Sequence, residues 1–182
     1  QVLDLQSHTV RTLPIEARSS IRTFALSPID DTLLIVADVK NYVMLINFHR
    51  GVVLHRMKMK EKISCIRFSP CGNYIAFAQG PQVHVWCTPQ TRHRTFSPMI
   101  KHREYTGSAN DITSIDWSAD SSLLVAGNKD STVRIWSLHT TKNFEPVTLS
   151  GHSSSIVGCF IVSTREKLEF IYSIREDGSL ER

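Results

Sequence analysis

A serine, a histidine and an aspartate near the C-terminus are the side chains in this sequence best suited to chemistry. His152 follows a glycine, Ser173 ends an apolar run, and Asp177 begins an Asp-Gly turn. The same three residue types supply the nucleophile, base and orienting carboxylate of many hydrolases. The corresponding positions one repeat earlier hold Ser108 in place of the histidine and Ala126 in place of the serine. Since an active site does not tolerate such drift, we interpret the set as structural rather than catalytic.

Other catalytic and cofactor-binding signatures are absent from the sequence. The eight histidines and four cysteines form no His-Glu-x-x-His or Cys-x-x-Cys pattern of the kind that ligates zinc. The few glycines form no phosphate-binding loop, and no apolar run approaches the roughly 20 residues that span a bilayer. We therefore expect no enzyme activity, no cofactor, no small-molecule substrate and no membrane partner. The cysteines are expected to be reduced thiols.

Positive charge is gathered in two groups in a chain of net charge +4. The first group lies in an insert, residues 90–105, that we expect to form a long surface loop, and its members are Arg92, Arg94, Lys101 and Arg103. The second group, which would share one face of a strand, consists of Lys58, Lys60 and Lys62. Basic clusters are typical of nucleic-acid binding, but short basic runs are also common on solvated surfaces. Both groups are candidate sites for RNA or for a protein partner.

The elements that would position these residues are indicated by one phrase that recurs along the chain. An isoleucine begins the phrase, a second apolar residue follows three positions later, and a serine closes three of the four copies. The copies begin at Ile21, Ile63, Ile112 and Ile156, so successive copies lie 42, 49 and 44 residues apart. A period in this range, filled with short strands, is typical of WD-type propeller blades, whereas ankyrin and TPR repeats are shorter.

Strand signals follow each copy of the phrase. A polar turn leads into a continuous apolar run, and the four runs are residues 33–37, 74–78, 123–126 and 170–173. Such runs, rich in β-branched and aromatic residues, fit strands that are covered on both faces. No apolar pattern of helical period persists, so the chain is predicted to be all-β. Three complete four-stranded blades are expected at 21–60, 63–105 and 112–149, with parts of two more at 1–13 and 156–182. We expect a segment of a larger propeller, one of seven blades.

The recurring phrase and its turns resemble the WD-repeat family. In that family a loop histidine, a strand serine or threonine, a turn aspartate and a strand tryptophan form a hydrogen-bonded network that ties each blade together. The resemblance implies this structural role for His152, Ser173, Asp177, Asp130 and Trp136. The strand ends at Leu3 and at Ile46-Asn47 lack the Trp-Asp signature, so those blades are expected to depend on apolar packing.

The order of several stretches adds a closer resemblance, to a family of nucleolar WD-repeat proteins that have two tandem propellers. The stretches include 12–14, 52–55, 114–117, 149–152 and 156–160. This resemblance implies part of the first propeller of a scaffold in the small-subunit processome, which processes precursor ribosomal RNA to 18S rRNA with a box C/D small nucleolar ribonucleoprotein. It implies a nucleolar location, other processome WD-repeat proteins as partners, and contact with precursor or small nucleolar RNA through the basic insert.

The alternative hypothesis is a generic WD-repeat module for protein interaction, such as a ubiquitin-ligase adaptor or a vesicle-coat scaffold. A propeller fold does not decide between the two, because function lies in the surface that the fold carries. Nucleolar location and salt-sensitive association would favour the RNA-particle scaffold.

Overall fold

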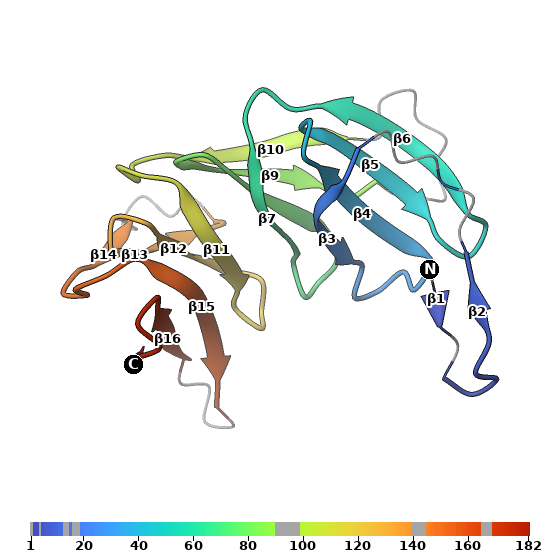
Figure 1. The fold of residues 1–182 in the computed structure, drawn as a ribbon. Coiled ribbons are helices and arrows are strands. Elements are labelled where there is room, and N and C mark those ends of the chain that lie inside the picture. The colour runs from blue at the N-terminus through green and yellow to red at the C-terminus, as the bar shows by residue number, and fades with distance from the viewer. Residues whose placement is uncertain are drawn as a thin grey trace.

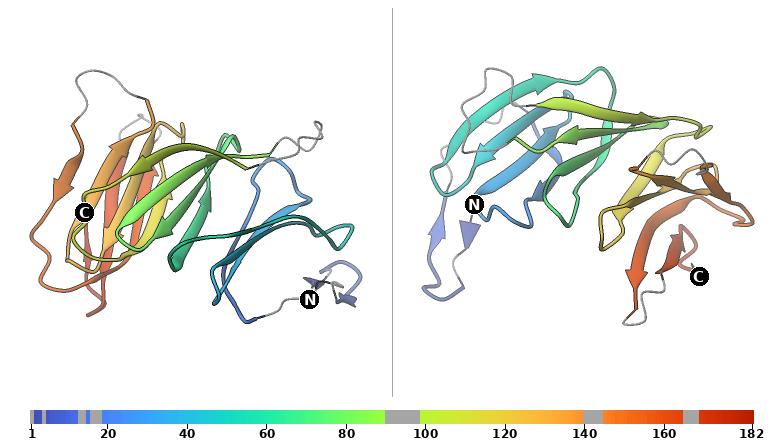
Figure 2. Two further views of the ribbon diagram at one scale, coloured as in Figure 1. Left: turned by 90° about the horizontal axis from the view of Figure 1, so that it is seen from above. Right: turned by 180° about the vertical axis from the view of Figure 1, so that it is seen from behind.

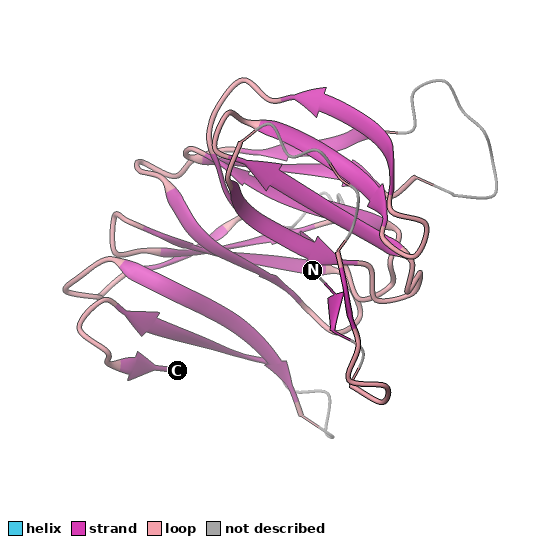
Figure 3. Ribbon diagram, turned by 45° about the vertical axis from the view of Figure 1, so that its right-hand side comes forward, coloured by secondary structure: helices cyan, strands magenta, loops and turns pink. Residues whose placement is uncertain are grey.

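The computed structural model of the chain consists of short antiparallel strands. It describes residues 2–3, 5–12, 15, 19–89, 99–139, 145–164 and 169–182. Those residues form strands, turns and loops and contain no helix, as Figure 3 shows. The predicted all-β fold, with four-stranded antiparallel sheets of the kind found in propeller blades, is confirmed.

Three of the sheets have four strands each, in simple chain order. The first sheet consists of β3 (Ile21–Leu26), β4 (Leu33–Asp38), β5 (Tyr42–Asn47) and β6 (Val52–Lys58). The second consists of β7 (Ile63–Phe68), β8 (Tyr74–Gln79), β9 (Gln82–Cys87) and β10 (Ile100–Tyr105). The third consists of β11 (Ile112–Trp117), β12 (Leu123–Asn128), β13 (Val133–Ser137) and β14 (Val147–Leu149).

Two smaller sheets complete the described structure. A three-stranded sheet consists of β15 (Ile156–Ser163), β16 (Glu169–Arg175) and β17 (Leu180–Glu181). A two-stranded hairpin consists of β1 (Val2–Leu3) and β2 (Val10–Arg11). Each of the four apolar runs found in the sequence lies within the second strand of a sheet, namely β4, β8, β12 and β16.

The sheets stand side by side in an arc, with the two termini at opposite ends (Figures 1 and 2). The first strand of each sheet packs beside the first strand of the next, so β3, β7, β11 and β15 form the inner side of the array. These four strands share an irregularity of register just after the first isoleucine of the phrase, at Ile21/Thr23, Ile63/Cys65, Ile112/Ser114 and Ile156/Gly158. The recurring phrase thus specifies an inner strand with a β-bulge near its start.

The core is divided among the interfaces between neighbouring sheets. Ile63 and Ile66 of β7 are fully buried in one cluster with Ile35 and Leu45 of the preceding sheet. The next interface repeats the arrangement in a cluster that includes Ile112 and Ile115 of β11. Burial of one such side chain stabilises the fold by about 1.5–3 kcal/mol. The phrase isoleucines of β7, β11 and β15 therefore hold their sheets against the preceding one, whereas Ile21 of β3 is 54% exposed.

The serine that closes the phrase organises the turn after the inner strand. Ser118 is fully buried, and its Oγ accepts a hydrogen bond from the Leu123 amide at 2.8 Å. The same hydroxyl donates to Asp120 Oδ1 at 2.6 Å, and the Ser122 amide donates to that oxygen at 2.9 Å. The hydrogen bond from Ser118 is the main reason that the pKa of Asp120 lies below its usual value. A hydroxyl at this position therefore keeps the turn amides satisfied where the chain leaves the inner strand.

Candidate interaction sites and structural networks

His152 and Ser173 lie together in the last sheet. His152 belongs to the connection between β14 and β15, and Ser173 lies on β16. The distance between His152 Nε2 and Ser173 Oγ is 3.1 Å, which is a hydrogen bond. Ser173 is 4% exposed and the His152 side chain is 7% exposed. A buried polar pair of this kind stabilises the sheet because each group satisfies the other.

The carboxylate that faces His152 belongs to Glu181 rather than to Asp177. Glu181 Oε2 lies 2.9 Å from His152 Nδ1, and its Oε1 lies 2.8 Å from Arg175 Nη2. Asp177 instead accepts a hydrogen bond from the Ser179 amide at 2.9 Å and one from the Ser179 hydroxyl, which lowers the pKa of its carboxyl. The structure therefore joins two of the three predicted residues and places the third in the neighbouring turn.

Asp130 and Trp136 have separate roles in the third sheet. Asp130 accepts hydrogen bonds from the Thr132 amide at 3.1 Å and from the Ala109 amide at 3.2 Å. It thereby ties the turn between β12 and β13 to the loop before β11. Trp136 is 3% exposed and stacks on Tyr105 of the preceding sheet, with ring centroids 5.5 Å apart. The carboxylate fixes a turn, and the indole anchors the interface between sheets.

The C-terminal part of the basic insert is a strand. Arg92 and Arg94 lie outside the described residues. Lys101 and Arg103, which the sequence suggested would lie in a long loop, are on β10, the fourth strand of the second sheet. Lys101 pairs with Glu104. The loop prediction is wrong for residues 100–105 because this run pairs with β9 and completes the sheet.

Arg103 is held against the third sheet. Its Nη1 donates a hydrogen bond to the Leu138 carbonyl at 3.2 Å, and its guanidinium lies 5.9 Å from the centre of the Tyr105 ring. These contacts give Arg103 a role in joining two sheets. The insert has two described cations. The Lys101 side chain is 41% exposed, whereas Arg103 is only partly exposed, so the charge of Lys101 is the more accessible one.

The second basic group does not share one strand face. Strand β6 ends at Lys58, and the Met59 amide just beyond it donates a hydrogen bond to the Asn41 carbonyl at 2.8 Å. Met59 itself is buried in the first interface. Lys60 and Lys62 therefore lie in the connection to β7, where both are exposed. The three lysines remain a cationic surface, but the prediction that they align along one strand is wrong.

Sequence reasoning missed a buried carboxylate that fixes the turn after β4. Asp38 is 1% exposed and accepts hydrogen bonds from Ser19 Oγ at 2.5 Å and from the Lys40 and Tyr42 amides at 2.9 and 2.8 Å. Burial by itself would raise the pKa of Asp38, but these donors outweigh it and the pKa is lowered. Its place at the end of an apolar run, just before the Val-Lys-Asn turn, is the signal that could have indicated a capping role.

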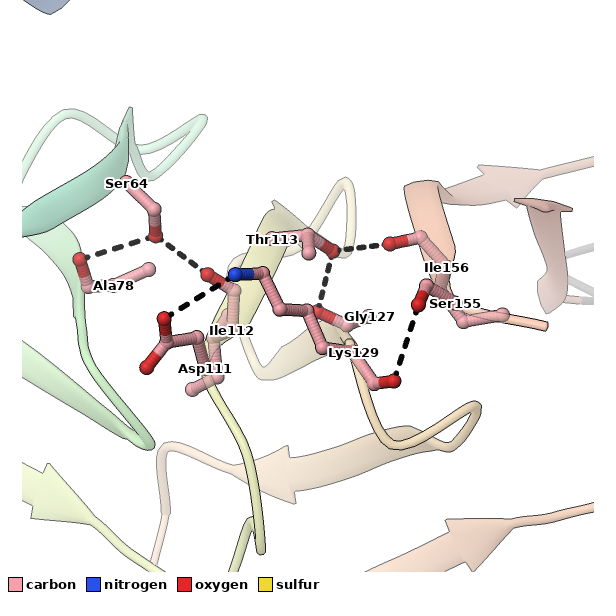
Figure 4. A network of polar contacts seen from close by, with 9 residues as sticks. All are labelled: Ser64, Ala78, Asp111, Ile112, Thr113, Gly127, Lys129, Ser155 and Ile156. Carbon is pink, nitrogen blue, oxygen red and sulfur yellow. Dashed lines mark hydrogen bonds and ion pairs between the residues drawn. The ribbon is translucent and has the colours of Figure 1, made fainter. Parts of the chain in front are cut away.

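Sequence reasoning also missed a repeated hydroxyl that joins neighbouring sheets (Figure 4). Ser64 Oγ, one residue after the phrase isoleucine of β7, donates to the Ile112 carbonyl of the next sheet at 2.6 Å. Thr113, at the equivalent position of β11, donates to the Ile156 carbonyl at 2.6 Å and lies 2.9 Å from the Gly127 carbonyl. We call these two side chains the inter-sheet hydroxyls. They occur where the bulge turns the side chain toward the neighbouring strand.

The described residues offer little for catalysis or metal binding. No three His, Cys, Asp or Glu side chains among them come together as metal ligands. Burial raises the pKa of the Cys159 thiol to about 12, so this cysteine is an unreactive core residue. Across the described ranges, no helix is long and apolar enough to cross a membrane.

Comparison with known families identifies the repeat. The family model described as "WD domain, G-beta repeat" matches residues 100–137. This range begins with β10, the outer strand of the second sheet, and continues through β11, β12 and β13, the first three strands of the third sheet. A sequence repeat therefore straddles two sheets, which links neighbouring blades along the chain.

Relatives match along nearly the whole chain. The periodic tryptophan protein 2 homolog of Schizosaccharomyces pombe is 38% identical over 180 residues, which is 98% of this chain and 21% of the relative. Periodic tryptophan protein 2 of Saccharomyces cerevisiae is 36% identical over 98% of this chain and 19% of its own length. The Arabidopsis thaliana protein is 35% identical over 97% of this chain and 20% of its own length. The chain spans about a fifth of the length of these relatives.

A solved structure confirms the fold. The protein described as "Structure of U3-55K" superposes with a TM-score of 0.68, covering 91% of this chain and 56% of that one, at 16% sequence identity. Residues 100–137 thus carry a WD repeat, the chain has the fold of WD-repeat propeller blades, and it resembles periodic tryptophan protein 2 over almost all of its length.

Proposed function

We propose that the chain is part of a non-catalytic scaffold of the nucleolar small-subunit processome. In this role it would support the assembly and processing of precursor ribosomal RNA to 18S rRNA with a box C/D small nucleolar ribonucleoprotein. The observation that carries the proposal is the resemblance to periodic tryptophan protein 2, which extends over 97–98% of the chain in three distant organisms.

The polar groups of the structure support a scaffold rather than an enzyme. Ser173 is buried and bonded to His152, while Asp177 is turned toward Ser179. Glu181 does face His152, but a serine nucleophile also needs an accessible hydroxyl. Because Ser173 is 4% exposed, this arrangement suits a structural network. The partners would be other processome WD-repeat proteins.

RNA contact is the finer part of the proposal. The exposed lysines Lys58, Lys60 and Lys62 offer point charges for phosphate groups, whereas the ammonium of Lys101 is already paired with Glu104. Arg103 is engaged with backbone carbonyls and is the less suitable phosphate ligand.

A replacement experiment tests the function. This chain would replace the matching segment of the relative in S. pombe, in a strain whose own copy can be depleted. We expect nucleolar localisation, sedimentation with precursor particles and normal 18S rRNA. A control would lack the segment, and 18S rRNA should then fall while large-subunit rRNA persists. Normal 18S rRNA in the strain lacking the segment would contradict the proposal.

Replacing Lys58, Lys60 and Lys62 with Gln tests the RNA contact. If the lysines bind phosphates, the salt dependence of particle association should become shallower by about 0.7–0.9 in slope for each phosphate that is no longer bound. Lys129→Gln is the matched control, because Lys129 is exposed but already lies 3.5 Å from Asp111. Equal slopes in the triple variant and the control would exclude these lysines as RNA ligands.

A further inference from the structure

We propose that the outer edge of β6 is a docking site for an extended segment of another protein. The segment would pair with β6 as a fifth strand of the first sheet. It would carry acidic residues at its N-terminal end and apolar residues after them. This inference does not depend on the scaffold role, and it can be tested with purified protein. It assigns Lys58 and Lys60 to a protein partner, so it competes with the RNA contact proposed above for the same lysines.

The edge of β6 is open along the described part of the chain. The order of the sheet is β3-β4-β5-β6, so β6 is an outer strand, and among the described strands it pairs with β5 alone (Figure 1). An outer strand turns a row of amide and carbonyl groups away from its sheet, where an added strand can bind them. At seven residues β6 is longer than the outer strands β10 and β14, which have six and three.

The first half of β6 exposes three consecutive apolar side chains. Val52 is 50% exposed, Val53 is 39% exposed and Leu54 is 47% exposed. Leu54 is the extra residue of a bulge, because the pairing with β5 passes from His55 directly to Val53. Bulges occur next to binding sites, where they direct a side chain outward. Burying this apolar surface is the hydrophobic part of the docking energy.

The other outer strands carry the features by which proteins protect such edges. Strand β10 has charged residues along its length, including Lys101, Arg103 and Glu104. Strand β14 is too short to pair with a long partner. Charges and short length are common defences against unwanted strand pairing. The first half of β6 has neither, which sets it apart from the equivalent strands in the same chain.

The second half of β6 is cationic and predicts an acidic partner segment. Arg56 and Lys58 lie over the Tyr42 ring, at 5.4 and 5.6 Å from its centre, and Lys60 is exposed just beyond the strand. Among the described residues, no carboxylate lies within ion-pair distance of Lys58 or Lys60. Acidic residues in the partner would complement this end. Antiparallel pairing, as in the rest of the sheet, places them first in the partner segment.

Two other occupants fit less well. RNA would satisfy the cations, but its sequence-specific binding on sheets uses exposed aromatic rings, and the face of Tyr42 is already covered by Arg56 and Lys58. A second copy paired antiparallel through β6 would set the cationic half of one strand against the apolar half of the other. Neither arrangement uses both halves of the edge.

Fluorescence anisotropy with a labelled peptide tests the proposal on the full-length protein. The probe is Glu-Asp-Glu-Thr-Val-Thr-Val-Thr, and the control is the same sequence in reverse order. We expect the forward peptide to bind and the reversed peptide to bind at least about tenfold more weakly, a difference of about 1.4 kcal/mol. Val53→Lys with Leu54→Lys should abolish the difference, while Val147→Lys on β14 should leave it unchanged. Circular dichroism checks that each variant is folded.

Charge reversal identifies the register. Lys58→Glu should weaken the forward peptide by about tenfold, and a peptide with lysines in place of the acidic residues should restore binding. Equal binding of forward and reversed peptides, or no effect of the paired lysine substitutions, would overturn the proposal. So would displacement of the peptide by single-stranded RNA, or a concentration-dependent dimer that Leu54→Lys dissolves. If the peptide does not bind β6, we still expect normal 18S rRNA production in the replacement strain, so the two proposals fail separately.

Discussion

Replacing Thr113 with valine tests whether the inter-sheet hydroxyls hold the sheets together. Thr113 Oγ1 donates to the Ile156 carbonyl at 2.6 Å and contacts the Gly127 carbonyl at 2.9 Å (Figure 4). Valine has nearly the same shape, so the substitution removes the polar contacts while largely preserving the packing. It also removes the donor from two carbonyls near a closely packed interface.

The expected loss of stability follows from those two contacts. A hydrogen bond between neutral groups contributes about 0.5–1.5 kcal/mol net. Because one hydroxyl proton serves both carbonyls, we expect the free energy of unfolding to fall by about 1–2 kcal/mol rather than by the sum of two full bonds. For a unit of this size each kcal/mol lowers the melting temperature by about 2–4 °C.

Urea unfolding of the wild type and the variants would measure the effect. Thr113→Ser retains a donor and should recover most of the stability. Thr148→Val on the exposed strand β14 is the control for introducing a valine, and it should change the unfolding free energy little. Ser64→Ala should lower it by a similar amount, since Ser64 makes the equivalent contact one sheet earlier. A free energy of unfolding for Thr113→Val equal to that of the wild type within experimental error would refute the reasoning.

Three further perturbations follow from the same structure. A Cβ on Gly127 of the third sheet would lie 2.5 Å from Ile156 Cγ2 of the next sheet. Gly127→Ala should therefore lower the free energy of unfolding by about 1–3 kcal/mol through overpacking. An unchanged urea midpoint would show that these two sheets separate easily. His152→Ala leaves the buried Ser173 hydroxyl without its partner. We therefore expect the free energy of unfolding to fall by about 1–3 kcal/mol. An unchanged free energy of unfolding would show that this hydrogen bond does not stabilise the sheet. Burial would raise the pKa of the Cys71 thiol, but hydrogen bonds from Ser121 and other groups outweigh it and lower the pKa. Cys71 should therefore react with iodoacetamide faster than the other thiols near neutral pH, as peptide mapping would show.

The recurring phrase made the inner strands predictable. Each copy begins with an isoleucine that is buried between sheets, as at Ile63 and Ile112, or that starts the equivalent strand, as at Ile21. Packing between sheets favours apolar residues there, so the physical constraint is visible in the sequence. The polar turns between strands were visible for a similar reason, because buried turn amides need nearby acceptors.

The outer strands and the polar partners were less predictable. Lys101 and Arg103 resemble loop residues because an outer strand borders solvent and imposes no apolar pattern. For the partner of His152 the sequence offers three carboxylates in one short stretch, Glu176, Asp177 and Glu181, and spacing alone does not decide which one faces the ring. That choice depends on the path of the turn into β17, where Arg175 holds Glu181 in place.

The difference between inner and outer strands also indicates where function lies on this chain. Inner strands repeat because each must bury the same face, and a substitution there changes stability first. Outer strands differ from sheet to sheet, since β6 is apolar and then cationic, β10 is charged throughout, and β14 is short. Most of the described candidate groups for a partner, from Val53 to Lys58 and at Lys101, lie on these variable strands, and Lys60 and Lys62 follow directly after β6. A WD-repeat chain can therefore keep one scaffold while its outer strands specify different partners.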